Sequence, residues 1–276
     1  MHEVQAVTES SMRGHLLGLC NSMDACLLGL LDSKRRVAEG VHETRKVGKA
    51  LRGGLALVGM PRATLGAVTA VGRMLAGQRD AVSRLKTWQR LGWEDAPQAE
   101  ADTISAVTAM LEKLAHSAGR KPPQEAVAWA VAHIATVRAA LVPRSEKSLL
   151  EALPQGLRRL KRRLAKRLCK LGMRRSDEPA FHEARKGLKA WLGAQILLGQ
   201  TANSDCLHLA ELLGDENDLS ALEAWLKARG FSKPMAPLMW RHLHERHHTV
   251  RIHCLAAKDA AKDGFGRSDL SPGSDH

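Results

Sequence analysis

The stretch Val41–Ala50 reads VHETRKVGKA, and 140 positions later the stretch Phe181–Ala190 reads FHEARKGLKA. In each copy a histidine is followed by an arginine and two lysines at a spacing that places all four on one face of a helix. Such a face covers roughly 10 Å along the helix axis, which predicts an extended polyanion as ligand. We call these faces the first stripe (His42, Arg45, Lys46 and Lys49) and the second stripe (His182, Arg185, Lys186 and Lys189).

A second pair of related segments follows the two stripes. Leu75–Asp80 reads LAGQRD, and Leu213–Asp218 reads LGDEND, so each begins with a leucine and a small residue and ends with an aspartate. Two repeats in the same order indicate an internal duplication. Aspartate favours helix starts, and it can equally orient a basic neighbour. Asp80 and Asp218 are therefore either helix-capping residues or carboxylates that orient the ligand-binding cations.

The composition favours a helical protein with an anionic partner. The 276 residues include 42 lysines and arginines against 29 acidic residues, which gives a net charge of +13 and a pI near 9.9. This charge favours nucleic acid, an anionic membrane or a polyphosphorylated partner. Tyrosine is absent, phenylalanine occurs three times and β-branched residues are dispersed, so we expect an all-α fold. Five scattered cysteines without a Cys-x-x-Cys pair disfavour a disulfide framework or a thiolate zinc site.

The apolar periodicity predicts two helical halves and a connector. The first half covers 8–92, a helical connector covers 93–144, the second half covers 145–262, and 263–276 is expected to be disordered. The predicted helices of the first half lie at about 16–31, 37–59, 62–75 and 78–92. In the second half, a leucine-rich basic segment comes first. The predicted helices after it lie at about 178–199, 203–213, 216–229 and 235–262.

The leucine-rich segment around Leu157–Leu171 repeats leucine every three or four residues, with basic residues on its other faces. One face should pack while the remainder attracts anions. Arg159, Arg163 and Lys166 are candidates for direct contact with the ligand. The alternative is a polybasic helix that only raises the local electrostatic potential.

The first ten residues contain Glu3 and Glu9, where a secretory signal would have a basic patch. No unbroken run of apolar residues approaches 18. We therefore expect neither secretion nor a membrane span, and we expect a cytoplasmic protein.

The two stripes and the two Leu-to-Asp segments resemble the CHAD domain, named for conserved histidines in an α-helical domain. Each half of that domain carries a His-x-x-Arg-Lys stripe and a later Leu-Gly-x-x-Arg/Asn-Asp segment, and the correspondence covers roughly residues 10–255. The resemblance implies two four-helix bundles related by a pseudo-two-fold axis. It also implies that basic residues of both halves face a central channel or cleft that binds inorganic polyphosphate. Members are associated with polyphosphate granules and are not generally regarded as enzymes, so no cofactor, metal or membrane partner is implied.

Carried over position by position, the resemblance assigns both stripes, Arg52 and Arg79 to polyphosphate binding, with Asp80 and Asp218 as orienting carboxylates. Two positions depart from the family pattern, because Leu192 stands opposite Arg52 in the repeat and Ala76 replaces the usual glycine. The second stripe should therefore bind less strongly. Because a histidine has a pKa near 6.5, binding is expected to tighten on acidification. The full set of expected ligands is His42, Arg45, Lys46, Lys49, Arg52, Arg79, His182, Arg185, Lys186, Lys189, Arg159, Arg163 and Lys166.

Two other functions fit parts of the sequence. The charge permits nucleic-acid binding, but no helix-turn-helix, zinc-finger or RNA-binding aromatic motif is recognisable. His244, Glu245 and His248 match the H-E-x-x-H pattern of zinc hydrolases. Cationic residues inside that motif and the lack of an obvious third ligand disfavour this hydrolase reading.

Two tryptophans, Trp88 and Trp225, follow Asp80 and Asp218 at similar distances. We expect them to fill helix interfaces rather than to stack on nucleic-acid bases.

Overall fold

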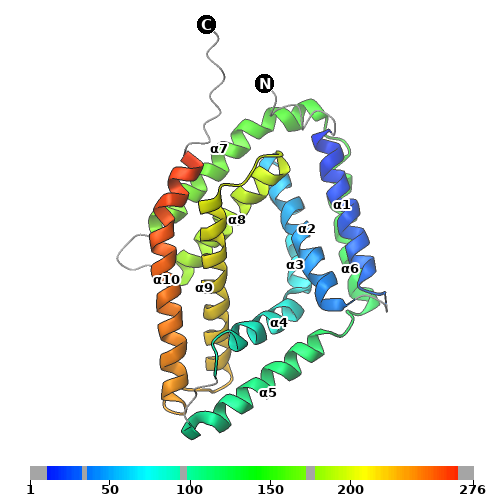
Figure 1. Cartoon of the computed structure of the whole chain (residues 1–276). Coiled ribbons are helices and arrows are strands. Elements are labelled where there is room, and N and C mark those ends of the chain that lie inside the picture. The colour runs from blue at the N-terminus through cyan, green and yellow to red at the C-terminus, as the bar shows by residue number, and fades with distance from the viewer. Residues whose placement is uncertain (1–10, 33–35, 94–97, 172–177, 267–276) are drawn as a thin grey trace.

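The computed structural model describes residues 11–32, 36–93, 98–171 and 178–266, and this part of the chain is built from helices and contains no strand (Figure 1). The all-α prediction is confirmed. The helices are α1 (Met12–Gly29), α2 (Val37–Leu57), α3 (Arg62–Met74), α4 (Ala76–Gln89), η2 (Gln98–Glu100), α5 (Ala101–Ala118), α6 (Gln124–Leu141), α7 (Glu146–Lys170), α8 (Glu178–Leu197), α9 (Ser204–Ala228) and α10 (Pro237–Gly266).

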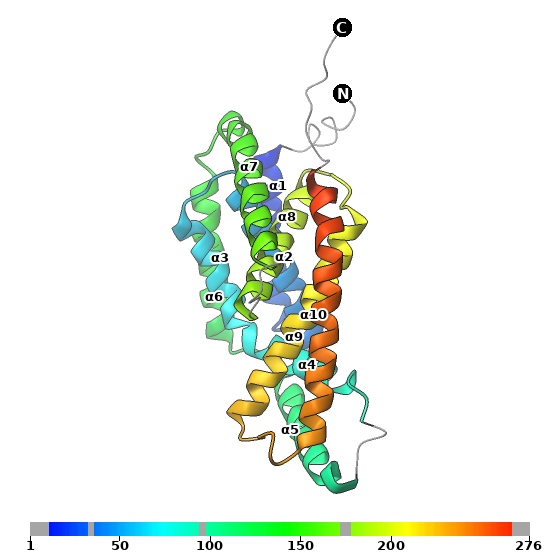
Figure 2. The ribbon, with the colours of Figure 1, turned by 90° about the vertical axis from the view of Figure 1, so that its left-hand side faces the viewer.

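The buried apolar side chains form two cores. The first core lies among α1, α2, α3 and α6, and the second lies among α8, α9 and α10, with contributions from α4, α5 and the end of α7. Both views show the first group beside the second, with α2 and α8 in the middle (Figures 1 and 2). The two stripe helices α2 and α8 pack against each other where the two groups meet.

The two cores do not coincide with the expected sequence halves 8–92 and 145–262. Helix α4 belongs to the first half, yet its Trp88 is buried in the second core. The segment expected to be a connector is also divided, because α6 packs in the first core and α5 packs against α4. The chain therefore crosses between the cores at several points, and the helices expected to connect the halves complete the two cores.

The two Leu-to-Asp segments have different local structures. The first contains the break between α3 and α4 at Leu75, which redirects the chain from the first core to the second. The predicted break near Gly214 is wrong, because α9 runs unbroken from Ser204 to Ala228. A single glycine costs a helix only about 1 kcal/mol, and the apolar face of α9 continues across it from Leu213 to Leu219.

Helix α7 joins the two cores. Its Leu149 is buried in the first core, and its Leu164 and Leu168 are buried in the second. Between these contacts, Gly156 lies against the end of α2 so closely that a Cβ atom there would stand 1.8 Å from the carbonyl oxygen of Leu57. Only glycine permits this backbone approach, which fixes where α7 crosses α2.

Two carboxylates accept hydrogen bonds from the first turns of helices that are remote from them in sequence. Glu146 accepts hydrogen bonds from the backbone N–H groups of Met12 and Arg13 at 2.6 and 3.0 Å. Buried Glu100 accepts from those of Leu238 and Met239 at 2.7 and 2.8 Å. Each carboxylate satisfies two N–H groups that lack partners within the helix and carries a charge that the positive end of the helix favours.

The C-terminal helix is longer than predicted. Helix α10 reaches Gly266, so residues 263–266 belong to it, while residues 267–276 of the expected tail lie outside the described residues. The five cysteines, all in the described part of the chain, form no disulfide. No single described helix is long and apolar enough to cross a membrane, although α6 and α7, bent by 101°, pass that criterion when taken together.

The substitution Gly156→Ala should destabilise the protein by about 1–3 kcal/mol, because the added methyl group meets backbone rather than a movable side chain. The control Gly66→Ala adds a methyl group to α3 where nothing lies within 4 Å. It should stabilise the protein by about 0.5–1 kcal/mol through helix propensity. Urea unfolding followed by circular dichroism measures both. Equal stability of the two variants would show that the contact between α7 and α2 is not tight.

Candidate functional site

Helices α2 and α8 bring cations of both stripes into one group. Lys49 is repelled by Arg45, Arg185, Arg79 and Arg52, and Lys189 is repelled by Arg185, Lys49 and Arg79. Arg79 comes from α4 and acts on both lysines. We call these six residues the central cluster: Arg45, Lys49 and Arg52 of α2, Arg79 of α4, and Arg185 and Lys189 of α8.

Burial and mutual repulsion make the charged state of the central cluster unfavourable. Burial and then the neighbouring cations lower the pKa of Lys49 to about 8, although part of its surface faces solvent. The same two causes lower the pKa of Lys189 to about 8. The pKa values of the Arg45 and Arg185 guanidinium groups also fall, chiefly through burial. An anion placed among these groups would remove the repulsion, so the arrangement favours anion binding.

Asp218 links α9 to α4 within this site. Its carboxylate lies 3.4 Å from Nη2 of Arg79 and accepts a hydrogen bond from the Ser83 hydroxyl at 2.9 Å. Asp80 lies 3.3 Å from Nη1 of Arg79. Both aspartates stand inside helices rather than at helix starts, so the capping interpretation is wrong. Their contacts fit the alternative, in which they orient a basic neighbour, Arg79.

Asn217 holds the second stripe in place. The Nδ1 atom of His182 lies 2.9 Å from Oδ1 of Asn217, and Nη1 of Arg185 lies 3.5 Å from the same oxygen. The Nε atom of Arg185 is buried and has no hydrogen-bond partner in the described part of the chain. Buried N–H groups normally have partners, so this one is available to an anion. Asn217 was not among the predicted site residues, although the repeat places it opposite Arg79 in the Leu-to-Asp segments.

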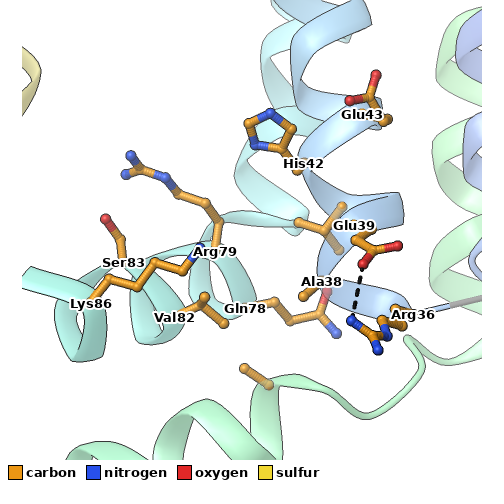
Figure 3. Close-up of a pocket in the computed structure, with 12 residues that line it drawn as sticks. Arg36, Ala38, Glu39, His42, Glu43, Gln78, Arg79, Val82, Ser83 and Lys86 are labelled. Atoms are coloured by element: carbon orange, nitrogen blue, oxygen red, sulfur yellow. Dashed lines mark hydrogen bonds and ion pairs between the residues drawn. The ribbon is translucent and has the colours of Figure 1, made fainter. Parts of the chain in front are cut away.

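His42 faces a pocket of about 820 Å³ between the start of α2 and α4. In Figure 3, His42 and Arg79 point into the space between the two helices, while Glu39 is held by Arg36 at 3.5 Å. Lys86 lines the same pocket. The pocket shares Arg79 with the central cluster, so it extends the positively charged region toward the start of α2.

The remaining residues of the two stripes are neutralised on their own helices. Lys46 lies 3.9 Å from Glu43, and Lys186 lies 2.9 Å from Glu183. Both lysines are exposed. Exposed pairs of this kind contribute little energy, and these two lysines belong to the edge of the site.

The three predicted ligands on α7 lie apart from the central cluster. The guanidinium group of Arg159 lies beside Gly59, just after the end of α2. Arg163 and Lys166 line a separate pocket of about 440 Å³ between α7 and α8, together with Arg167 and Glu183. Arg167 binds Glu183 at 2.7 Å, so part of the positive charge in this pocket is already neutralised.

The histidine-rich part of α10 forms a buried ion network. His247 lies 3.1 Å from Glu216 and 3.3 Å from Glu223, and Arg251 lies 2.8 Å from Glu216. Burial opposes protonation of His247, but hydrogen bonds to the two glutamates outweigh it and raise its pKa. The sequence analysis did not predict a role for His247, because this residue lies between the ligand positions of the H-E-x-x-H match.

The motif itself does not assemble a metal site. His244 lies 3.5 Å from Glu223, and both His244 and His248 are exposed. Within the described ranges, no three His, Cys, Asp or Glu side chains are grouped as ligands for a metal ion.

No family model and no curated protein sequence matches this chain. Among solved structures, it is similar to the crystal structure of the CHAD domain from the plant Ricinus communis, with a TM-score of 0.59 and 19% sequence identity. The similarity covers 94% of this chain and 91% of the plant domain. The chain therefore has the fold of a CHAD domain.

Proposed function

We propose that the protein binds inorganic polyphosphate at the central cluster without catalysing a reaction, and that it acts at polyphosphate granules in the cytoplasm. The observation that carries this proposal is the convergence of six cations from α2, α4 and α8 at one place. Asp80 and Asp218 are both engaged with Arg79, and Glu216, which acts on Arg185, is engaged with Arg251. The cluster is therefore left with a large excess of positive charge.

The shape of the charged region supports an extended ligand. The line of basic residues on α2 runs from His42 to Arg52, which is roughly 15 Å along the helix axis. Arg185 and Lys189 provide a second line on the neighbouring helix α8. Several phosphoryl groups in a row could contact both lines, whereas one phosphate ion could contact only a few of these side chains.

The side chains around the cluster favour phosphate over nucleic-acid bases. Two pockets adjoin it, one with His42 and Arg79 and one with Arg45, Lys49 and Arg52. Among the described residues that line these two pockets, none is Trp or Phe. Proteins that bind single-stranded nucleic acids usually stack bases on such rings. A ligand made of phosphate alone needs no ring.

The double variant Arg45→Ala with Arg185→Ala should lower the affinity for long-chain polyphosphate by roughly 100-fold or more. Each arginine can make charge-assisted hydrogen bonds to phosphate, worth about 1.5–3 kcal/mol per side chain. Calorimetric titration at several salt concentrations measures the effect, and the salt dependence should also become shallower.

The matched control for this variant removes the same charge elsewhere. Arg62 and Arg241 are exposed and lie outside the central cluster, so Arg62→Ala with Arg241→Ala should change the affinity less than about fivefold. Duplex DNA of matched charge should not displace polyphosphate from the wild-type protein. Equal losses in the two double variants, or full displacement by DNA, would reduce binding to general electrostatics.

The affinity for polyphosphate should fall at least about tenfold between pH 7 and pH 9.5. Lys49 and Lys189 have pKa values of about 8 in the free protein, and a bound polyanion raises them. Binding therefore has its full strength below the free pKa and weakens as pH rises through it, by up to about tenfold per lysine per pH unit. Calorimetry in buffers across this range measures the trend.

The control for the pH dependence is Lys49→Arg with Lys189→Arg, which keeps both charges throughout the range. Its affinity should vary less than about threefold between the same two pH values. A wild-type profile as flat as that of this variant would contradict the assignment of the two lysines to the site.

A further inference from the structure

Another positively charged hollow borders α4. It has a volume of about 700 Å³ and runs between α4, the α5–α6 connection and the end of α9. We call it the α4–α9 groove. Arg79 and Ser83 of α4 line the pocket of Figure 3, whereas Ala81 and Arg84 line this groove. Gln78 and Ala118 line both hollows, so the two adjoin, but none of the six residues of the central cluster lines the groove.

The α4–α9 groove attracts anions. Arg84, Arg120, Lys121 and Arg229 line it, and no Asp or Glu does so among the described residues. Burial lowers the pKa of Arg84, and Arg229 lowers it further, while Asp80 opposes the shift. Arg84 and Arg229 thus act on each other across the groove, and a bound anion would relieve their repulsion.

One end of the groove differs from the central cluster because it contains an aromatic ring. Trp225 is half-buried at the end of α9, and the guanidinium carbon of Arg229 lies 5.5 Å from the centre of its ring. Leu114 and Pro122 add apolar surface to the groove. A tryptophan ring beside an arginine plane is the combination on which proteins stack nucleobases.

The cations follow one another along α4. The amide of Gln78 donates a hydrogen bond to the carbonyl oxygen of Arg120 at 2.8 Å, so Arg120 lies near the start of α4. Arg84 lies six residues further along, roughly 9 Å, on the side of Arg229. Asp215 pairs with Arg90, and Asp218 accepts from Ser83, so α9 runs antiparallel to α4 and carries Trp225 toward the start of α4. Arg120, Arg84 and Trp225 with Arg229 thus line one groove, which suits a ligand that has an aromatic base and several phosphates.

We propose that the α4–α9 groove binds a nucleoside triphosphate, with the base against Trp225 and the phosphates beside Arg84 and Arg120. The volume of the groove lies within the range of small-molecule sites, which is about 300–1,000 Å³. Both parts of the ligand have matching groups: the ring and apolar surface receive the base, and the cations receive the phosphates. This site is independent of the proposed polyphosphate function.

The test titrates ATP, tripolyphosphate and adenosine separately by calorimetry into the double variant Arg45→Ala with Arg185→Ala, where the central cluster is weakened. ATP should bind more tightly than either of the other two. Adding Trp225→Leu should lower the affinity for ATP about tenfold and the affinity for tripolyphosphate less than about twofold. Adding Arg84→Ala should lower the affinity for both anions about tenfold. The control is Trp129→Leu, an exposed tryptophan of α6 outside the groove, which should change neither.

Two results would overturn the proposal. Unchanged ATP affinity in the Trp225→Leu and Arg84→Ala variants would place ATP elsewhere. If the Trp225→Leu variant lost affinity for ATP and for tripolyphosphate equally, the ring would not contact a base. Circular dichroism checks that each variant is folded, and Arg229→Gln replaces Trp225→Leu if loss of the indole from the helix interface unfolds the protein. In that variant a larger loss for ATP than for tripolyphosphate supports the proposal, and equal losses contradict it.

Discussion

Repulsion between like charges at the contact of α2 and α8 is the constraint on which the site depends. Burial, and then repulsion from the same arginines, lowers the pKa of both Lys49 and Lys189 to about 8. Like charges separate unless other interactions hold them together. Here α2 belongs to the first apolar core, whereas α7 and α8 have buried residues in both cores. The burial of apolar surface in the two cores therefore keeps the cations together in the absence of an anion.

The carboxylates near the cluster position cations without neutralising the whole group. Asp218 reaches from α9 to Arg79 of α4, and Asn217 next to it contacts His182 and Arg185 of α8. The preceding residue, Glu216, is buried and binds Arg251 and His247 of α10. Three consecutive residues of α9 thus connect the site to α4, α8 and α10. A neutral amide at position 217 orients the second stripe without cancelling its charge.

Much of the fold could be predicted from the sequence, and the repeats contributed most. The helix around His42, the helix around His182 and the long histidine-rich helix were all predicted close to their observed bounds, because their apolar periodicity and flanking prolines are local signals. The continuity of α9 across Gly214 was missed, since a glycine next to an aspartate resembles a break until the buried face on both sides is known. The division into cores was also missed, because the packing of α4 with α5 and of α3 with α6 depends on long-range contacts.

Only part of the predicted set of site residues lies together in the structure. Arg45, Lys49, Arg52, Arg79, Arg185 and Lys189 lie together, as the resemblance to the CHAD domain implied. Arg163 and Lys166 instead share helix α7 with buried leucines and face a different pocket. The most direct measurement is a crystal structure of the protein with bound polyphosphate. We expect phosphoryl groups between α2 and α8, within hydrogen-bond distance of both Arg45 and Arg185. A chain lying along the outer face of α7, with no phosphate near these two arginines, would contradict it.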